Sequence, residues 1–219
     1  MTSSLSAPAR RTRDGQLTNT VYERLRSEII RGVLRPNEAL VEALIAERLG
    51  VSRTPVRESL QRLSVDGLIV SRRRRWVVYE HTREEVTEIY ELRAALESYA
   101  ARLAASRRTE EQIAEVECLY EETKVHAVHG RERVEANEHF HDAINRMSHN
   151  ERLFQTILRS RVYGFNDRVA AAYSPEQYAE SWAQHGAIVE AVRRGEASLA
   201  GELARSHVDY SLEMVLSLY

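Results

Sequence analysis

The segment LGVSRTPVRESLQRLSVDGLIV, residues 49–70, decides the fold of the first part of the chain. Val56, Leu60 and Leu63 recur at the spacing of one helix face, and Pro55 suits a first turn, where a backbone N–H has no helical partner. The segment therefore predicts a helix with one buried face. Four polar side chains lie at its start and on its outer face: Arg53, Thr54, Arg57 and Gln61.

Two further apolar patterns precede this helix. Residues 19–32 carry apolar side chains four positions apart, and a second short stripe ends at Gly50, where a C-cap glycine is expected. A helix, a short turn and a second helix form the arrangement that presents a recognition helix to the DNA major groove. An arginine such as Arg57 can form a bidentate bond with guanine there. An ordinary helical hairpin with a solvated basic face explains the periodicity equally well.

The stretch after Gly67 favours DNA binding. Residues 68–70 and 76–79 have the composition of strands, and residues 71–75, SRRRR, lie between them as a turn. A two-stranded hairpin directly after a recognition helix is a wing, whose arginines can reach phosphates or a narrow minor groove. A solvated loop is the commoner explanation of such a run, but its position behind the helix favours nucleic acid. The predicted wing contacts are Arg73, Arg74 and Arg75.

Charge is unevenly distributed along the 219 residues. Fifteen arginines and nine acidic residues give +6 over residues 1–80, whereas 16 basic and 24 acidic residues give −8 over residues 81–219. The asymmetry suggests a basic domain for a polyanion and an acidic domain with another role. We predict a disordered arm over residues 1–17, a DNA-binding domain over residues 18–80 and a second domain over residues 81–219.

The single cysteine, Cys118, excludes an intrachain disulfide and fits a cytoplasmic protein. No apolar run is long enough to cross a bilayer, so we expect no membrane partner. Arg10 and Arg11 are not followed by an apolar segment and do not indicate an export signal.

The remainder of the chain has a helical pattern. Thr82 is a suitable N-cap, and Pro175 fits the first turn of a later helix. Six helices are predicted, near residues 83–106, 109–128, 131–148, 150–172, 175–194 and 196–218. Their short connections favour an antiparallel bundle of six or seven helices. The predicted fold class is mainly α, with an N-terminal winged helix-turn-helix domain and this C-terminal bundle.

Polar side chains interrupt the apolar stripes of four of these helices. Burying such groups costs several kcal/mol unless they find partners. The residues are Arg93, Asn137, His141, His185 and His207.

Two explanations account for these inward polar groups. In the first, each is satisfied separately, Arg93 by Glu97 one turn later and each histidine by a carbonyl or another neighbour. In the second, imidazole nitrogens and an amide oxygen bind one divalent transition metal ion, such as zinc, nickel or manganese, and Arg93 pairs with a bound carboxylate. Three inward histidines together with an asparagine favour the second explanation.

The opening segment resembles the winged helix-turn-helix of the GntR family of bacterial transcriptional regulators, and the likeness covers about residues 18–80. It implies that Arg53 and Arg57 contact the operator with help from Thr54. The chain departs from relatives in two places. The wing tip has no glycine, and Ala43 stands where some relatives have a DNA-contacting arginine.

The motifs ELRAALE, NEHFHDAI and HGAIVEAVRRGE with ARSHV are similar to the FCD ligand-binding domain of the FadR subfamily, over about residues 85–216. In metal-containing members an aspartate and three histidines bind one divalent ion. The matching positions are Asn137, His141, His185 and His207. The resemblance also implies that Arg93 contacts an effector carboxylate. Asn137 brings no negative charge, which predicts a lower metal affinity or a different preferred ion.

Residues and resemblance together predict a dimeric regulator without enzymatic activity. It binds a palindromic operator in double-stranded DNA, represses a catabolic operon and is released by a small organic acid. One rival hypothesis is a metal-dependent hydrolase fused to a DNA-binding module, with Glu138 as general base, although no HExxH motif is present. Another is a constitutive DNA-binding protein whose helical domain only dimerises.

Overall fold

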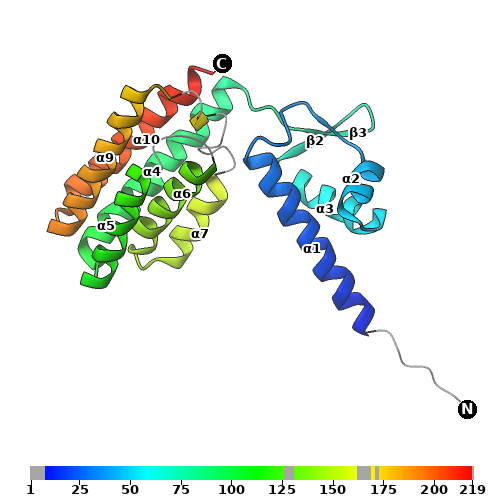
Figure 1. Ribbon diagram of the computed structural model, residues 1–219, viewed down its shortest axis with the longest axis horizontal. Helices are drawn as coiled ribbons and strands as arrows, with labels where there is room; N and C mark the ends of the chain where they lie inside the picture. Colours follow the sequence, from blue (N-terminus) through cyan, green and yellow to red (C-terminus); the bar gives the residue numbers. More distant parts are fainter. Residues whose placement is uncertain (1–7, 126–130, 162–168, 171–172, 219) are drawn as a thin grey trace, which may run out of the picture. The chain divides into compact units, whose positions relative to one another are not determined.

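The computed structural model describes residues 8–125, 131–161, 169–170 and 173–218. It divides into two compact units, Met1–Glu80 and His81–Tyr219 (Figure 1). The predicted fold class is confirmed: a small winged helix-turn-helix unit is followed by a helical bundle. Among the described residues, no helix is long and apolar enough to span a membrane.

The first unit combines three helices with a small sheet. The helices are α1 (Pro8–Ile30), α2 (Glu42–Leu49) and α3 (Arg53–Val65). The strands are β1 (Ala39–Leu40), β2 (Ile69–Arg72) and β3 (Arg75–Val78), in the antiparallel order β1-β3-β2. Helix α3 packs against α1 and α2 through its predicted apolar face. The fully buried side chains of this core are Leu25, Val56, Leu60, Leu63 and Ile69.

The first helix begins much earlier than predicted. Residues 8–17, assigned to a disordered arm, form the first turns of α1, whereas residues 1–7 lie outside the described residues. Thr18, the residue directly after this extension, is bound to α3. Thr18 Oγ1 donates to Glu58 Oε2 at 2.7 Å, and Ser59 Oγ donates to the Thr18 carbonyl at 2.8 Å. Residues 8–17 lack an apolar stripe, so sequence periodicity gave no signal for this extension.

The wing is tighter than predicted. Only Arg73 and Arg74 form its turn, because Arg72 and Arg75 already pair as opposite strand residues. Both turn residues have positive φ, 51° and 63°, which is the pattern of a type I′ hairpin turn. Glycine or asparagine normally takes these positions, since a Cβ atom is strained there. The predicted five-residue turn over 71–75 was therefore too long, and the missing glycine leaves a strained turn.

The second unit is built from helices. They are α4 (Arg83–Arg107), α5 (Glu110–Val125), α6 (Arg131–Arg146), α7 (Glu151–Ser160), α9 (Pro175–Arg194) and α10 (Ala197–Leu216). Helix α4 lies at the centre and packs against α6, α7, α9 and α10. Thr82, Asn150 and Ser174 each accept the N–H of the third helical residue, as N-caps do. The predicted helix over 150–172 is not continuous, because α7 ends at Ser160 with Arg161 as its C-cap; residues 162–168 and 171–172 of that prediction lie outside the described residues.

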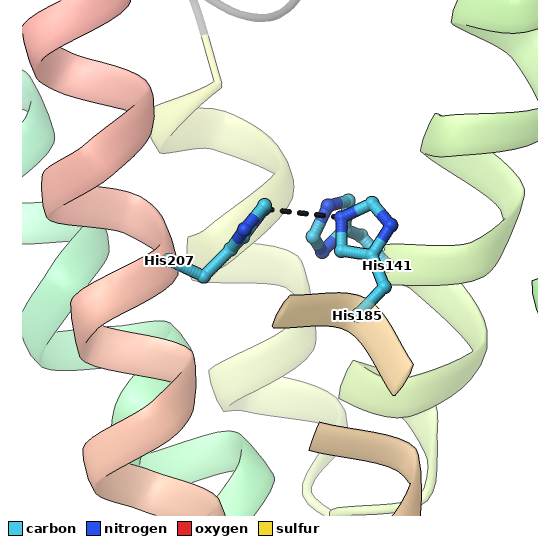
Figure 2. Close-up of side chains that lie close together, drawn as sticks. All are labelled: His141, His185 and His207. Carbon is cyan, nitrogen blue, oxygen red and sulfur yellow. Dashed lines mark hydrogen bonds between the residues drawn. The ribbon is translucent and has the colours of Figure 1, made fainter. Parts of the chain in front are cut away.

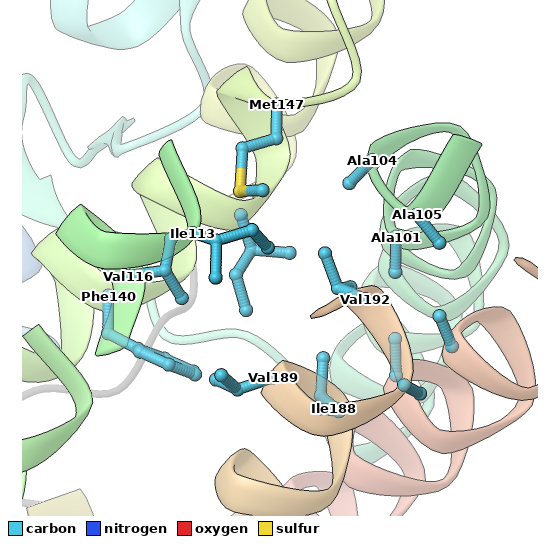
Figure 3. Close-up of a cluster of buried hydrophobic side chains, with 14 residues drawn as sticks. Ala101, Ala104, Ala105, Ile113, Val116, Phe140, Met147, Ile188, Val189 and Val192 are labelled. Carbon is cyan, nitrogen blue, oxygen red and sulfur yellow. The ribbon is translucent and has the colours of Figure 1, made fainter. Parts of the chain in front are cut away.

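Small residues let the central helices approach closely. Ala101, Ala104 and Ala105 of α4 face Val189 and Val192 in the buried core (Figure 3). A Cβ atom at Gly201 of α10 would come within 3.1 Å of the Ser98 carbonyl of α4. This close contact sets the distance between the two helices that carry the inward arginine and one of the inward histidines.

Candidate functional site

Three helices bring the predicted histidines together. His141 comes from α6, His185 from α9 and His207 from α10, and their rings face one another (Figure 2). Their candidate ligand atoms all lie within 4.8 Å of one another. The Nε2 atoms of His185 and His207 are 3.2 Å apart. His185 and His207 are 3% and 5% exposed, and His141 is half-buried.

Burial keeps these imidazoles neutral. Desolvation lowers the pKa of His141 and His185 well below the usual value, and the neighbouring His207 lowers both further. Desolvation also lowers the pKa of His207, to about 4, although Glu97 acts in the opposite direction. Near neutral pH each ring therefore offers a nitrogen lone pair, as a metal ligand must.

One hydrogen bond of the cluster orients His207 as a metal ligand. His207 Nδ1 donates to Gln184 Oε1 at 3.0 Å, which leaves the Nε2 lone pair directed at His185. His185 Nδ1 is buried and has no hydrogen-bond partner among the described residues. Two nitrogens 3.2 Å apart subtend about 100° at an ion about 2.1 Å from each, a normal ligand angle. Any pair of ligand nitrogens that lies near the 4.8 Å limit would have to move closer together to bind the same ion.

A pocket beside the histidines contains the other predicted residues. Arg93, Asn137, His141 and His207 all line it. The remaining lining residues are Tyr90, Val169, Tyr173, Ser181 and Ser211. Arg93 is 8% exposed, and its Nε donates to Glu97 Oε1 at 3.0 Å. Its Nη1 atom is buried without a hydrogen-bond partner among the described residues, so it can still pair with a ligand oxygen.

A second arginine, Arg161, which the sequence analysis did not single out, interacts with the same Glu97. Arg161 Nη1 donates to Asp142 Oδ1 at 2.5 Å, and its Nη2 lies 3.9 Å from Glu97 Oε2. Burial alone would raise the pKa of Glu97, but Arg93 and Arg161 outweigh burial and hold that pKa below its usual range. Arg161 lies seven residues after Phe154 and four after Ile157, the buried residues of α7, so this helical spacing could have identified it as an inward-facing arginine.

The predicted DNA contacts lie on exposed surfaces of the first unit. Arg53, Thr54, Arg57 and Gln61 occupy the outer side of α3, and Arg73, Arg74 and Arg75 are exposed on the wing. Glu42 of α2 holds the Arg57 guanidinium, with 2.9 Å between Nη2 and Oε2 and 3.2 Å from Nε to each carboxylate oxygen. This pair fixes the direction of Arg57. Glu42 lies 15 residues earlier, so local spacing could not reveal it.

Comparisons with known proteins agree with this architecture. Residues 17–78 match the model of bacterial regulatory proteins of the gntR family, and residues 88–210 match the FCD domain. The chain is 32% identical to the Nta operon transcriptional regulator of Aminobacter aminovorans, covering 83% of this chain and 88% of that protein. It is 30% identical to a probable D-xylose utilization operon transcriptional repressor of Paenarthrobacter nicotinovorans, covering 93% and 91%.

A solved structure supports the same assignment. The chain is similar to McbR/YncC of E. coli, with a TM-score of 0.79, 25% sequence identity and coverage of 92% of this chain and 97% of that one. Both matching domains occur here in the order that the fold shows. The chain therefore belongs to the GntR family of bacterial transcriptional regulators and carries an FCD domain.

Proposed function

We propose that this regulator is a homodimeric repressor of a catabolic operon, and that a small organic acid bound beside a divalent metal ion releases it from a palindromic operator. The observation that carries the proposal is the convergence of three neutral histidines, two of which, His141 and His207, line one pocket together with Arg93. The relative named as a probable repressor of a D-xylose utilization operon supports the direction of the response.

The proposed ligands of the ion are His141, His185, His207 and Asn137. When bound, the ion supplies an open coordination position for a carboxylate oxygen. Arg93 Nη1 pairs with the acid, while Glu97 fixes the orientation of the guanidinium through Nε. Ser181 and Ser211 add hydroxyl groups to the pocket wall.

The switch requires that the acid bind the DNA-competent and DNA-free arrangements with different affinity. Helix α4, which carries Arg93, begins five residues after the end of β3 in the wing, so the two sites lie on adjacent elements of the sequence. The direct test is fluorescence anisotropy with a selected operator, with nickel or zinc and a panel of small carboxylic acids. Unchanged operator affinity under every condition would favour a constitutive DNA-binding protein instead.

Substitutions in the wing turn are expected to lower the affinity for DNA and to raise the stability of the first unit. We expect the double substitution Arg73→Asn, Arg74→Gly to weaken binding to operator and random DNA alike. It should also reduce the slope of log K against log salt concentration by about 1 for each phosphate that the wing no longer binds. The same variant should raise the free energy of unfolding of the first unit by about 1 kcal/mol, because the new residues tolerate positive φ.

Arg75→Gln is the matched control for the wing, since Arg75 lies in β3 and not in the turn. It should lower DNA affinity without raising the thermal unfolding temperature. A stabilised Arg75→Gln protein, or a double variant that loses affinity only for the operator, would contradict the proposed role of the wing.

The proposed dimer uses the exposed side of α4. Leu92 and Tyr99 are 51% and 53% exposed, and Leu96 lies between them on the same helix face. Glu91 and Arg102, both exposed, lie at opposite ends of this row. Antiparallel pairing of two copies about a twofold axis near Leu96 would place Leu92 near Tyr99, and Glu91 near Arg102, of the second copy. Such a pairing would bury the exposed apolar side chains and bring opposite charges together.

Charge reversal tests this face. We expect Glu91→Arg and Arg102→Glu each to weaken the dimer by about tenfold or more, because the twofold axis doubles every like-charge contact. The double variant should recover the dimer. Sedimentation equilibrium measures the constants, and Glu115→Arg on the exposed side of α5 is the control with the same charge change. If the single variants stay dimeric, or the double variant stays monomeric, another surface forms the dimer.

A further inference from the structure

The pocket beside the histidines has no acidic residue among its described lining residues, and Arg93 is the one lining residue with a permanent charge. The histidine cluster likewise includes no carboxylate that could serve as a fourth ligand in the described part of the chain. Asn137, which lines the same pocket, offers only a neutral amide. Among the described residues, the proposed ligands therefore supply nitrogen and amide donors but no negative charge of their own.

The nearest buried carboxylate is already engaged. Glu97 Oε1 accepts the hydrogen bond from Arg93, and Glu97 Oε2 faces Arg161 at 3.9 Å. Asp142 in turn pairs with Arg161. These two arginines and two carboxylates have a net charge of zero, so none of the negative charge is left over for a divalent ion.

An ion held by neutral ligands alone would thus bring two uncompensated positive charges into a largely buried site. Taking an uncompensated charge out of water is costly. An acid with two carboxylate groups removes this difficulty. One group can take the open coordination position, and the other can pair with Arg93 Nη1, which is buried without a partner among the described residues.

We infer that this regulator binds its metal ion and its acid as one unit: the ion is held tightly only together with a dicarboxylate, and the dicarboxylate only together with the ion. The inference rests on the proposed function in assigning the acid to the pocket of Arg93. It makes the protein a sensor of two coincident signals, and it treats the ion as a ligand instead of a permanent cofactor. By linkage, the acid must raise the metal affinity by the same factor as the metal raises the acid affinity.

The test measures metal binding to the full-length protein after removal of bound metal with a chelator. Isothermal titration with nickel is run in acetate and in succinate at equal ionic strength, with free nickel calibrated in each buffer without protein. We expect nickel affinity to be at least tenfold higher in succinate, and the succinate affinity to rise by the same factor when nickel is present. Equal nickel affinity in the two buffers would overturn the inference.

Asn137→Asp supplies the missing charge. This variant should bind nickel about tenfold more tightly in acetate, and the enhancement by succinate should fall below about threefold. Asn19→Asp, which makes the same change at an exposed position of the first unit, should behave as the wild type. An Asn137→Asp protein with the wild-type enhancement would contradict the inference; if it fails to fold, the acetate and succinate comparison on the wild type still decides.

The outcomes separate this inference from the proposed function. If succinate binds and lowers operator affinity without metal, the proposal of an acid-responsive regulator holds, but the proposed coupling between metal and acid is wrong. Nickel affinity that is equally high in acetate would also contradict the coupling without contradicting the proposed function. If neither nickel nor succinate binds in any combination, both the inference and the proposed effector site are wrong.

Discussion

His207→Ala is expected to lower the affinity for nickel or zinc by about 100-fold or more, measured by equilibrium dialysis with elemental analysis in the presence of succinate. The substitution removes the imidazole whose Nε2 lies 3.2 Å from that of His185, so the two most buried donors no longer face each other. Loss of residues that merely orient metal ligands costs about 10- to 100-fold, and loss of a ligand should exceed that range. The operator response to nickel and succinate should disappear with the metal.

Two control variants make this result specific. His139→Ala removes an exposed histidine from the same helix as His141 and should leave metal affinity unchanged. Gln184→Ala removes the acceptor of His207 Nδ1 and should lower metal affinity by about 10- to 100-fold, because the ring loses its orientation. Operator binding without ligands should persist in all three variants. Wild-type metal affinity in the folded His207→Ala protein would show that the histidines have a structural role.

Arg57→Ala should weaken operator binding by about 10- to 100-fold, corresponding to one bidentate arginine–guanine contact of about 1–3 kcal/mol. Binding to random DNA should fall much less, since that interaction depends mainly on phosphate contacts. Arg57 is exposed on α3 and is directed by Glu42. Fluorescence anisotropy titrations with operator and random duplexes at one salt concentration measure the ratio of the two affinities.

A substitution of Glu42, the partner of Arg57, tests the same contact with DNA. Glu42→Gln keeps the shape of the side chain but weakens its hold on the guanidinium, so operator preference should fall while the affinity for random DNA holds or rises. Arg35→Ala is the charge control for Arg57→Ala, because Arg35 is exposed and lies outside α3. It should lower the affinities for operator and random DNA by the same factor. If Arg57→Ala lowers both affinities by the same factor, Arg57 contacts phosphate and not a base edge.

Local patterns were sufficient for much of the fold. The stripe of Val56, Leu60 and Leu63 predicted α3, and the strand composition around the arginine run predicted the wing. Thr82 and Ser174 marked helix starts because a cap involves only the next three residues. Some differences from the prediction occur at elements with distant contacts: Thr18 of α1 is bound by Glu58 and Ser59, and β1 pairs with β3. The wing turn and the end of α7 differ from the prediction within a few residues of local sequence.

The sequence by itself determined which residue types face the interior, because helical periodicity assigns each side chain to a face of its own helix. It therefore identified Arg93, Asn137 and the three histidines as inward polar groups. Only the tertiary structure decided that rings from α6, α9 and α10 meet at one point, and that Glu97 is shared between Arg93 and Arg161. Periodicity is a property of one helix, whereas these distances depend on the rotation, spacing and register of several helices, which close packing of residues such as Ala101 and Gly201 sets.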